Sequence, residues 1–280
     1  MRLIFLALFS FNIFAQDLAW DRENSCPVGD MAFVEKVLSE MTVEEKVGQT
    51  IMADLDFIKP IDLRRYPIGG ILNGGNTSPN GNQQASTDEW KSLAQDFYEE
   101  SIKTGSNIPI LWGTDAVHGH SNVLGATIFP HNIGLGASAN EQLLEAIGAA
   151  VAEEVLATGL YWTFAPTVTV PQDYRWGRTY EGYSESPELV SKLGESFIYG
   201  LQGKGDEFLK SNKIIGTAKH FLGDGGTYLG VDQGDTKVDE KTLQDIHGTP
   251  YYSALDACIQ TVMASFNSWN GSKVHGNEYL

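Results

Sequence analysis

The sequence has few basic residues. Its 280 residues include 19 Lys and Arg against 36 Asp and Glu, which gives a formal net charge of -17. A field of this sign repels phosphate backbones and anionic lipid, so we expect no nucleic-acid partner, whereas a neutral ligand is tolerated. With 42% hydrophobic residues, the chain has enough apolar material for one large globular domain.

Cysteine is also scarce, and the usual cofactor motifs are missing. Cys26 and Cys258 allow one disulfide at most, and buried unpaired thiols are the commoner use of isolated cysteines, so we expect no disulfide framework. His118 and His120 stand two residues apart without a further ligand cluster, so we expect no metal site. No GxGxxG or GxxxxGK[ST] follows an apolar run, so we expect no cofactor.

The N-terminus has the layout of a signal peptide. Arg2 precedes an apolar run over 3–9, and small residues follow at Ala15 and Ala19. The run is too short to span a membrane, and cleavage after Ala15 or Ala19 is plausible. We therefore expect a leader over 1–19 and an exported domain over 20–280. The mature protein would be periplasmic or secreted and would not contact a membrane.

Short apolar runs alternate with amphipathic stretches along the rest of the chain. The runs include "IGGILNGG", "IPILWGTDAVHG", "LYWTFAPTVTV", "IIGTAKHFLGDGG" and "TVMASFNSWNG". This alternation predicts an α/β protein with a parallel sheet covered by helices. An open doubly wound sheet and a (β/α)8 barrel both fit the periodicity. Polar residues follow each run, where barrel enzymes place their sites, which favours the barrel modestly.

Three of these polar segments are candidates for chemistry. Asp115 follows one run, and it could equally be the satisfied carboxylate of a turn. "PQDYRWGRTYEGYSESP" mixes two Arg with aromatic and acidic residues. It could be a structural ion network, a wall for sugar rings, or both. In "TAKHFLGDGG", Lys219 and His220 precede a glycine-rich turn, and a buried Lys needs a carboxylate or a hydroxyl-rich ligand.

Six ordered motifs resemble the N-terminal barrel of glycoside hydrolase family 3, especially its β-glucosidases and exo-β-glucanases. They are "MTVEEKVGQ", "GTDAVHGH", "GATIFPHNIGLGA", "FAPTVTVPQDYRWGRTYEGYSESPELV", "TAKHFLGDGGT" and "VMASFNSWNG", and the similarity runs from about Phe33 to the end of the sequence. The resemblance implies a (β/α)8 TIM-type barrel followed by a second α/β domain. It also implies hydrolysis of terminal non-reducing β-D-glucosyl residues with retention of configuration.

The resemblance also implies roles for individual residues. Asp115 would bind distal sugar hydroxyls, and Arg178, Lys219 and His220 would donate to neighbouring ones. Arg178 is preferred to the nearby Arg175 because it matches the "GR" of the family motif. Met263 and Phe266 would line the floor of the site near the reacting carbon.

The sequence departs from the family pattern at its C-terminal end. The nucleophilic Asp of relatives lies in a later strand, which would fall beyond Leu280, and the acid/base is also expected outside this chain. We therefore expect a barrel whose last strands are missing. A non-catalytic sugar-binding fragment is the alternative. Asp224 occupies the place of the catalytic His of the family's N-acetylglucosaminidases, which favours the glucan-type enzymes.

Overall fold

The fold is built around six parallel strands. A computed structural model describes residues 26–27 and 29–280, and the predicted leader 1–19 lies outside this range. The strands are β1 (Met52–Asp54), β2 (Gly70–Asn73), β3 (Leu111–Thr114), β4 (Trp162–Thr163), β5 (Thr217–Phe221) and β7 (Thr261–Ala264). Hydrogen bonds join neighbouring strands in the order β1-β2-β3-β4, and a separate pair of strands is formed by β5 and β7. Two parallel bridges, Trp162 to Ile215 and Thr167 to Lys219, connect these two groups.

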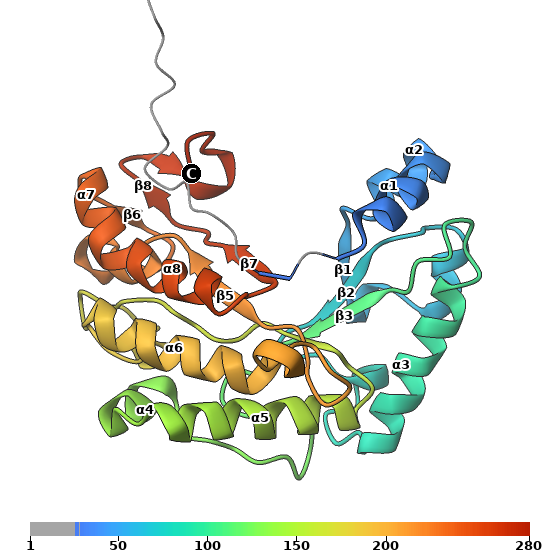
Figure 1. Ribbon diagram of the computed structural model, residues 1–280, viewed down its shortest axis with the longest axis horizontal. Coiled ribbons are helices and arrows are strands. Elements are labelled where there is room, and N and C mark those ends of the chain that lie inside the picture. Colours follow the sequence, from blue (N-terminus) through green and yellow to red (C-terminus); the bar gives the residue numbers. More distant parts are fainter. Residues whose placement is uncertain (1–25, 28) are drawn as a thin grey trace, which may run out of the picture.

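The helices from α3 onward follow strands and cover the outside of the arc that the strands form, and α1 and α2 precede β1 (Figure 1). Their bounds are α1 (Met31–Glu40), α2 (Val43–Gly48), α3 (Thr87–Ser101), α4 (Asn132–Ser138), α5 (Glu141–Ala157), α6 (Pro187–Gln202), α7 (Glu240–Thr242) and α8 (Thr249–Asp256). A π-helical turn, Leu243–Gly248, joins α7 to α8. Across the described residues, none of these helices has the length and apolarity needed to cross a membrane.

Local sequence explains where the long helices begin. The side chains of Ser86, Asn140 and Ser186 accept hydrogen bonds from backbone N–H groups in the first turns of α3, α5 and α6. Such caps satisfy N–H groups that have no partner within the helix. The alternation of strands and capped helices confirms the predicted fold class, a (β/α) barrel that is incomplete in the described residues.

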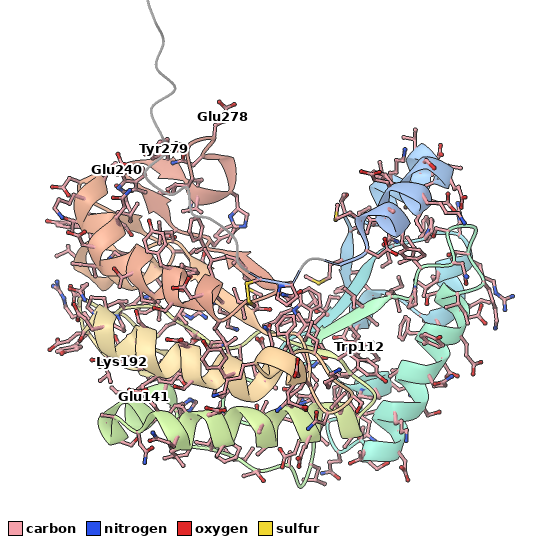
Figure 2. All side chains as sticks on the ribbon, viewed as in Figure 1. Trp112, Glu141, Lys192, Glu240, Glu278 and Tyr279 are labelled. Atoms are coloured by element: carbon pink, nitrogen blue, oxygen red, sulfur yellow. A yellow bond between two sulfur atoms is a disulfide. The ribbon has the colours of Figure 1, made fainter. Side chains whose placement is uncertain are left out.

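The core lies between the strands and the helices that cover them. Trp112 of β3, labelled in Figure 2, packs edge-on against Phe97 of α3, and its ring lies 5.8 Å from that of Trp90. Helices α5 and α6 approach closely at Gly200, which has no side chain. A Cβ at this position would lie 2.2 Å from the carbonyl oxygen of Glu145. These contacts hold the strands in a fixed register, which positions the residues at their ends.

The two outer strands of the arc carry exposed apolar residues. Val262 on β7 is 47% exposed and Met52 on β1 is 39% exposed. Helix α1 has no buried residue, and Phe33 on it is 63% exposed. A short sheet of β6 (Asp235–Thr236), β8 (Ser268–Trp269) and β9 (Ser272–Lys273) stands apart from the main arc. Within the described residues, therefore, the barrel is open between β7 and β1.

The expectation of unpaired cysteines is wrong. Cys26 and Cys258 form a disulfide with a Cα–Cα distance of 5.4 Å and a sequence separation of 232 residues. Figure 2 shows the sulfur atoms in yellow near the end of α8. The sequence could not reveal this pair because it depends on the segment before α1 lying against the loop that precedes β7.

Candidate active site

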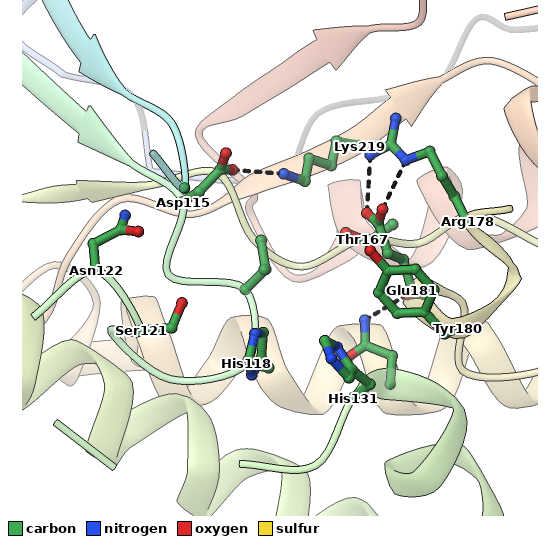
Figure 3. A pocket seen from close by; sticks show the side chains of 13 residues that line it. Asp115, His118, Ser121, Asn122, His131, Thr167, Arg178, Tyr180, Glu181 and Lys219 are labelled. Atoms are coloured by element: carbon green, nitrogen blue, oxygen red, sulfur yellow. Dashed lines mark hydrogen bonds and ion pairs between the residues drawn. The ribbon is translucent and has the colours of Figure 1, made fainter. Parts of the chain in front are cut away.

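Polar side chains gather in a pocket of about 320 Å³ at the carboxyl ends of the strands. The residues that supply its polar groups include Asp115, His118, His131, Thr167, Arg178 and Lys219 (Figure 3). They come from segments far apart in the sequence, and the parallel strands bring them together because all of these strands end at the same edge. The volume lies at the low end of the range for small-molecule sites, about 300–1,000 Å³.

A buried ion pair forms one wall of this pocket. Lys219 is only 4% exposed, and its Nζ donates to Oδ1 of Asp115 at 2.9 Å. The side chain of Asp115 is 32% exposed and therefore still reaches the pocket. The buried ammonium has the carboxylate partner that the sequence required, and the pair offers both a donor and an acceptor to a ligand.

Arg178 forms a second charged pair in the lining of the pocket. Its Nε and Nη2 donate to the two carboxylate oxygens of Glu181 at 2.7 and 2.9 Å. Burial is the largest influence and lowers the pKa of Arg178, but the hydrogen bonds to Glu181 and the negative charges of Glu181, Asp224 and Asp232 together outweigh it, so the pKa lies above its ordinary value. Arg175 does not line the pocket and instead pairs with Asp173 on the surface. The segment 171–187 thus forms both an ion network and part of the pocket wall, the two uses that its sequence allows.

His220 lies against Arg178 and does not itself line the pocket. Its Nε2 is 3.1 Å from Nη2 of Arg178, and its Nδ1 is 2.8 Å from Oδ2 of Asp224. The register of β5 against β7 shifts between Lys219 and Phe221. Lys219 and His220 adjoin this irregularity, and their side chains reach Asp115 and Arg178, respectively.

Aromatic rings complete the side of the pocket near α4. The rings of His118 and His131 lie 4.2 Å apart, and Tyr180 meets His131 edge-on at 4.7 Å. Burial, and next the charge of His131, lower the pKa of His118. A neutral imidazole at this wall can accept or donate a hydrogen bond, and the ring faces can pack on apolar parts of a ligand.

Thr167 is a pocket residue that the sequence did not single out. It is 1% exposed, and its hydroxyl has no hydrogen-bond partner among the described residues. It bridges Lys219 across the sheet, and paired residues of parallel strands face the same side. The sequence feature that could have pointed to Thr167 is a hydroxyl shortly after β4, within the apolar run "FAPTVTV".

Besides Arg175 and His220, three more residues considered from the sequence lie outside the pocket. Met263 is the register partner of Lys219 on β7 and is half-buried, but it does not line the pocket. Phe266 is 63% exposed and packs edge-on against His275. His120 turns into the core, where it bonds to Thr158 and burial lowers its pKa to about 4. No group of three or more His, Cys, Asp or Glu within the described ranges could hold a metal ion.

Comparison with known proteins gives consistent results. Residues 42–280 match the family described as "Glycosyl hydrolase family 3 N terminal domain". A periplasmic beta-glucosidase of Salmonella typhimurium is 30% identical over 254 residues, which cover 89% of this chain and 31% of that protein. A beta-xylosidase of Formosa agariphila is 32% identical over 182 residues, which cover 64% of this chain and 24% of that protein.

Solved structures show the same relationship. An exo-1,3/1,4-beta-glucanase from a Pseudoalteromonas species superposes with a TM-score of 0.86 at 52% identity, over 89% of this chain and 32% of that chain. A beta-glucosidase mutant from Listeria innocua, at 23% identity and a TM-score of 0.75 over 90% of this chain and 35% of that chain, shares the fold. The chain thus spans about a third of the length of these relatives. It belongs to glycoside hydrolase family 3 and carries the N-terminal domain of that family.

Proposed function

We propose that the pocket binds the terminal non-reducing β-D-glucosyl residue of a β-glucoside or β-glucan, as part of a retaining glycoside hydrolase. The observation that carries this proposal is the pairing of Lys219 with Asp115 beside Arg178 in one small pocket. Sugar hydroxyls both donate and accept hydrogen bonds. A buried ammonium, a half-exposed carboxylate and a planar guanidinium supply complementary partners for adjacent hydroxyls.

The orphan hydroxyl of Thr167 supports a polar ligand at the same place. A buried hydroxyl without a partner costs free energy, and a bound sugar would satisfy it. The exo-1,3/1,4-beta-glucanase, which is 52% identical over 89% of this chain, supports a glucosyl ligand. Met263 and Phe266 are proposed near the reacting carbon, and their position on β7 and just after it is compatible with that role.

The nucleophile is proposed to lie in polypeptide that follows Leu280 in the intact protein. A retaining mechanism needs two carboxyl groups about 5–5.5 Å apart, one as nucleophile and one as acid/base. In the described pocket, the carboxylates of Asp115 and Glu181 each hold a cation. Both are therefore better suited to binding than to attack on the anomeric carbon.

Export to the periplasm or out of the cell is part of the proposal. The leader-like segment 1–19 and the Cys26–Cys258 disulfide support it, since disulfides persist in oxidising compartments. A periplasmic relative is compatible with this location.

Turnover of a nitrophenyl β-glucoside tests the proposed activity. We expect the intact gene product to hydrolyse the glucoside with retention of configuration, as monitored by NMR of the anomeric proton. We expect no hydrolysis by residues 1–280 alone. Inversion by the intact protein would contradict the proposal. Turnover by the 280-residue chain would contradict the placement of the nucleophile. If the reading frame stops at Leu280 and the chain binds glucose without hydrolysing glucosides, the sugar-binding alternative would replace the enzyme.

A further inference from the structure

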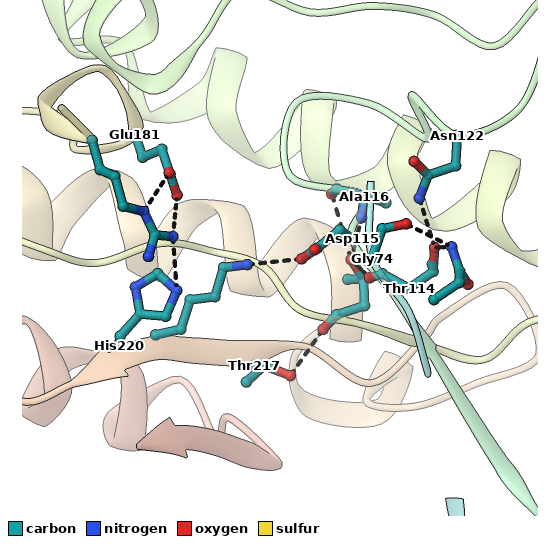
Figure 4. A network of polar contacts seen from close by, with 12 residues as sticks. Gly74, Thr114, Asp115, Ala116, Asn122, Glu181, Thr217 and His220 are labelled. Carbon is teal, nitrogen blue, oxygen red and sulfur yellow. Dashed lines mark hydrogen bonds and ion pairs between the residues drawn. The ribbon is translucent and has the colours of Figure 1, made fainter. Parts of the chain in front are cut away.

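A continuous chain of hydrogen bonds runs from the pocket into the interior. It begins at Arg178, passes through the imidazole of His220 and ends at the buried carboxylate of Asp224. Figure 4 shows the first link, with the guanidinium held between Glu181 and His220. Asp224 is 7% exposed and does not line the pocket.

The chemistry of the two ends fixes the proton positions on the imidazole. A guanidinium only donates, so Nε2 of His220, at 3.1 Å from Nη2 of Arg178, must accept. An ionised carboxylate only accepts, so Nδ1 of His220, at 2.8 Å from Asp224, must carry the proton and donate. His220 is therefore neutral and in the Nδ1–H tautomer.

We propose that Asp224 is a positioning residue that sets the tautomer of His220 and, through it, the orientation of Arg178 toward the sugar. The inference rests on the proposed sugar-binding function of the pocket. It assigns a role to Asp224 that motif comparison alone did not provide. It also gives His220 a direction: its Nε2 accepts from Arg178 and does not donate.

The surroundings of Asp224 hold its carboxylate in a single orientation. The Thr169 hydroxyl donates to Oδ1 at 2.6 Å, and the backbone N–H of Gly225 donates to the same oxygen at 2.9 Å. This leaves Oδ2 for His220. A Cβ on Gly225 would lie 2.7 Å from the Thr169 hydroxyl, so this close approach requires glycine.

The neighbouring His247 does not compete for this role. It is 3% exposed, and burial lowers its pKa to about 4, so it is neutral near pH 7. Burial is the largest influence and raises the pKa of Asp224, but the hydrogen bonds from His220 and Thr169 together with electrostatic interactions with His220 and His247 outweigh it, so the pKa lies below its ordinary value. Asp224 thus remains an acceptor at neutral pH.

The arrangement leaves one nitrogen of Arg178 for a ligand. Nε and Nη2 are used by Glu181, and Nη2 also contacts His220. Nη1 makes no such contact within the described residues and lies on a side chain that lines the pocket. With three anchors on the other nitrogens, the direction of the Nη1–H bonds is set before the sugar arrives, which lowers the entropic cost of binding.

The tautomer can be measured on the 280-residue chain without any sugar. Side-chain ¹H–¹⁵N correlation spectra at pH 7.5 distinguish protonated from unprotonated ring nitrogens, and H220Q identifies the His220 signals among the six histidines. We expect a protonated Nδ1 and an unprotonated Nε2. A proton on Nε2, alone or together with one on Nδ1, would overturn the proposal.

Asp224→Asn tests the link to Arg178. Its single carbonyl oxygen cannot accept from both His220 and the Thr169–Gly225 pair, so the Nδ1–H tautomer should lose its preference and glucose affinity should fall about tenfold, the effect of one hydrogen bond. Asp232→Asn is the matched control, because Asp232 accepts from Trp176 and does not contact His220. Asp232→Asn should leave the His220 spectrum unchanged.

The two readouts separate this proposal from the proposed function. If wild-type chain binds no glucose but His220 is in the Nδ1–H form, the sugar-binding function fails and the Asp224–His220 link stands. If Asp224→Asn retains both tautomer and affinity, the positioning role is wrong. Thr169→Val removes only one donor to Asp224 and provides a second test if Asp224→Asn does not fold. It should shift the His220 signals. Unchanged signals would contradict the link between Asp224 and His220.

Discussion

The strand-end pocket and the outer edges of the sheet differ in whether their side chains have partners. In the pocket, charged side chains are paired: Lys219 with Asp115 and Arg178 with Glu181. At the edges, apolar side chains are exposed, as on β7, where Val262 is 47% exposed. The charged groups of the pocket are thus organised by the six strands, whereas the edges are apolar surface that nothing in the described residues covers.

The sharpest test of the pocket is the asymmetry of its buried ion pair. Asp115→Ala leaves the ammonium of Lys219 buried without a partner, and we expect a loss of about 3–5 kcal/mol in the free energy of unfolding. Lys219→Met leaves a carboxylate that is 32% exposed and can be hydrated, so the loss should be smaller. Urea unfolding measures both. Equal losses for the two variants would show that Lys219 is not the less hydrated partner.

The disulfide ties the segment before α1 to the loop before β7, and its removal tests how far the edges depend on it. The bond closes a loop of 232 residues. We expect the Cys26→Ser, Cys258→Ser double variant to lose about 2–4 kcal/mol of stability, because its unfolded chain is less constrained. Glucose affinity should change little, since neither cysteine lines the pocket. An unchanged unfolding midpoint would contradict this account.

Thr167→Val separates binding from stability inside the pocket. The hydroxyl has no partner among the described residues, so its replacement by a methyl group of similar volume removes no internal hydrogen bond. We expect stability to be retained and glucose affinity to fall about tenfold, the loss of one hydrogen bond. Calorimetric titration and thermal unfolding are the measurements. A destabilised variant that keeps full glucose affinity would show that the hydroxyl stabilises the fold and does not contact the sugar.

A charge on the outer edge should have the smallest effect on stability. Val262→Lys places an ammonium on an exposed position of β7, and surface changes of this kind alter stability by about 0.5 kcal/mol or less. It should reduce self-association in sedimentation and lower the binding of a hydrophobic dye, because charged residues protect open edges. An unchanged sedimentation profile would show that this edge does not mediate association.

The alternation of strands and helices follows from the local apolar pattern, and the grouping of Asp115, Arg178 and Lys219 follows from the family motifs. The disulfide was not predictable, because pairing depends on the path of the chain before α1. The place of Thr167 in the pocket was not predictable either, since a threonine within an apolar run is usually a core residue and only its unpaired hydroxyl distinguishes it.

Glucose titration of two arginine variants tests the central claim most directly. Arg178 and Arg175 are three residues apart, and each pairs with a carboxylate, but only Arg178 lines the pocket. We predict that Arg178→Ala abolishes glucose binding to the 280-residue chain and that Arg175→Ala leaves it unchanged. Equal affinity of both variants and the wild type, or loss of binding in Arg175→Ala alone, would contradict the assignment of this pocket as the sugar site.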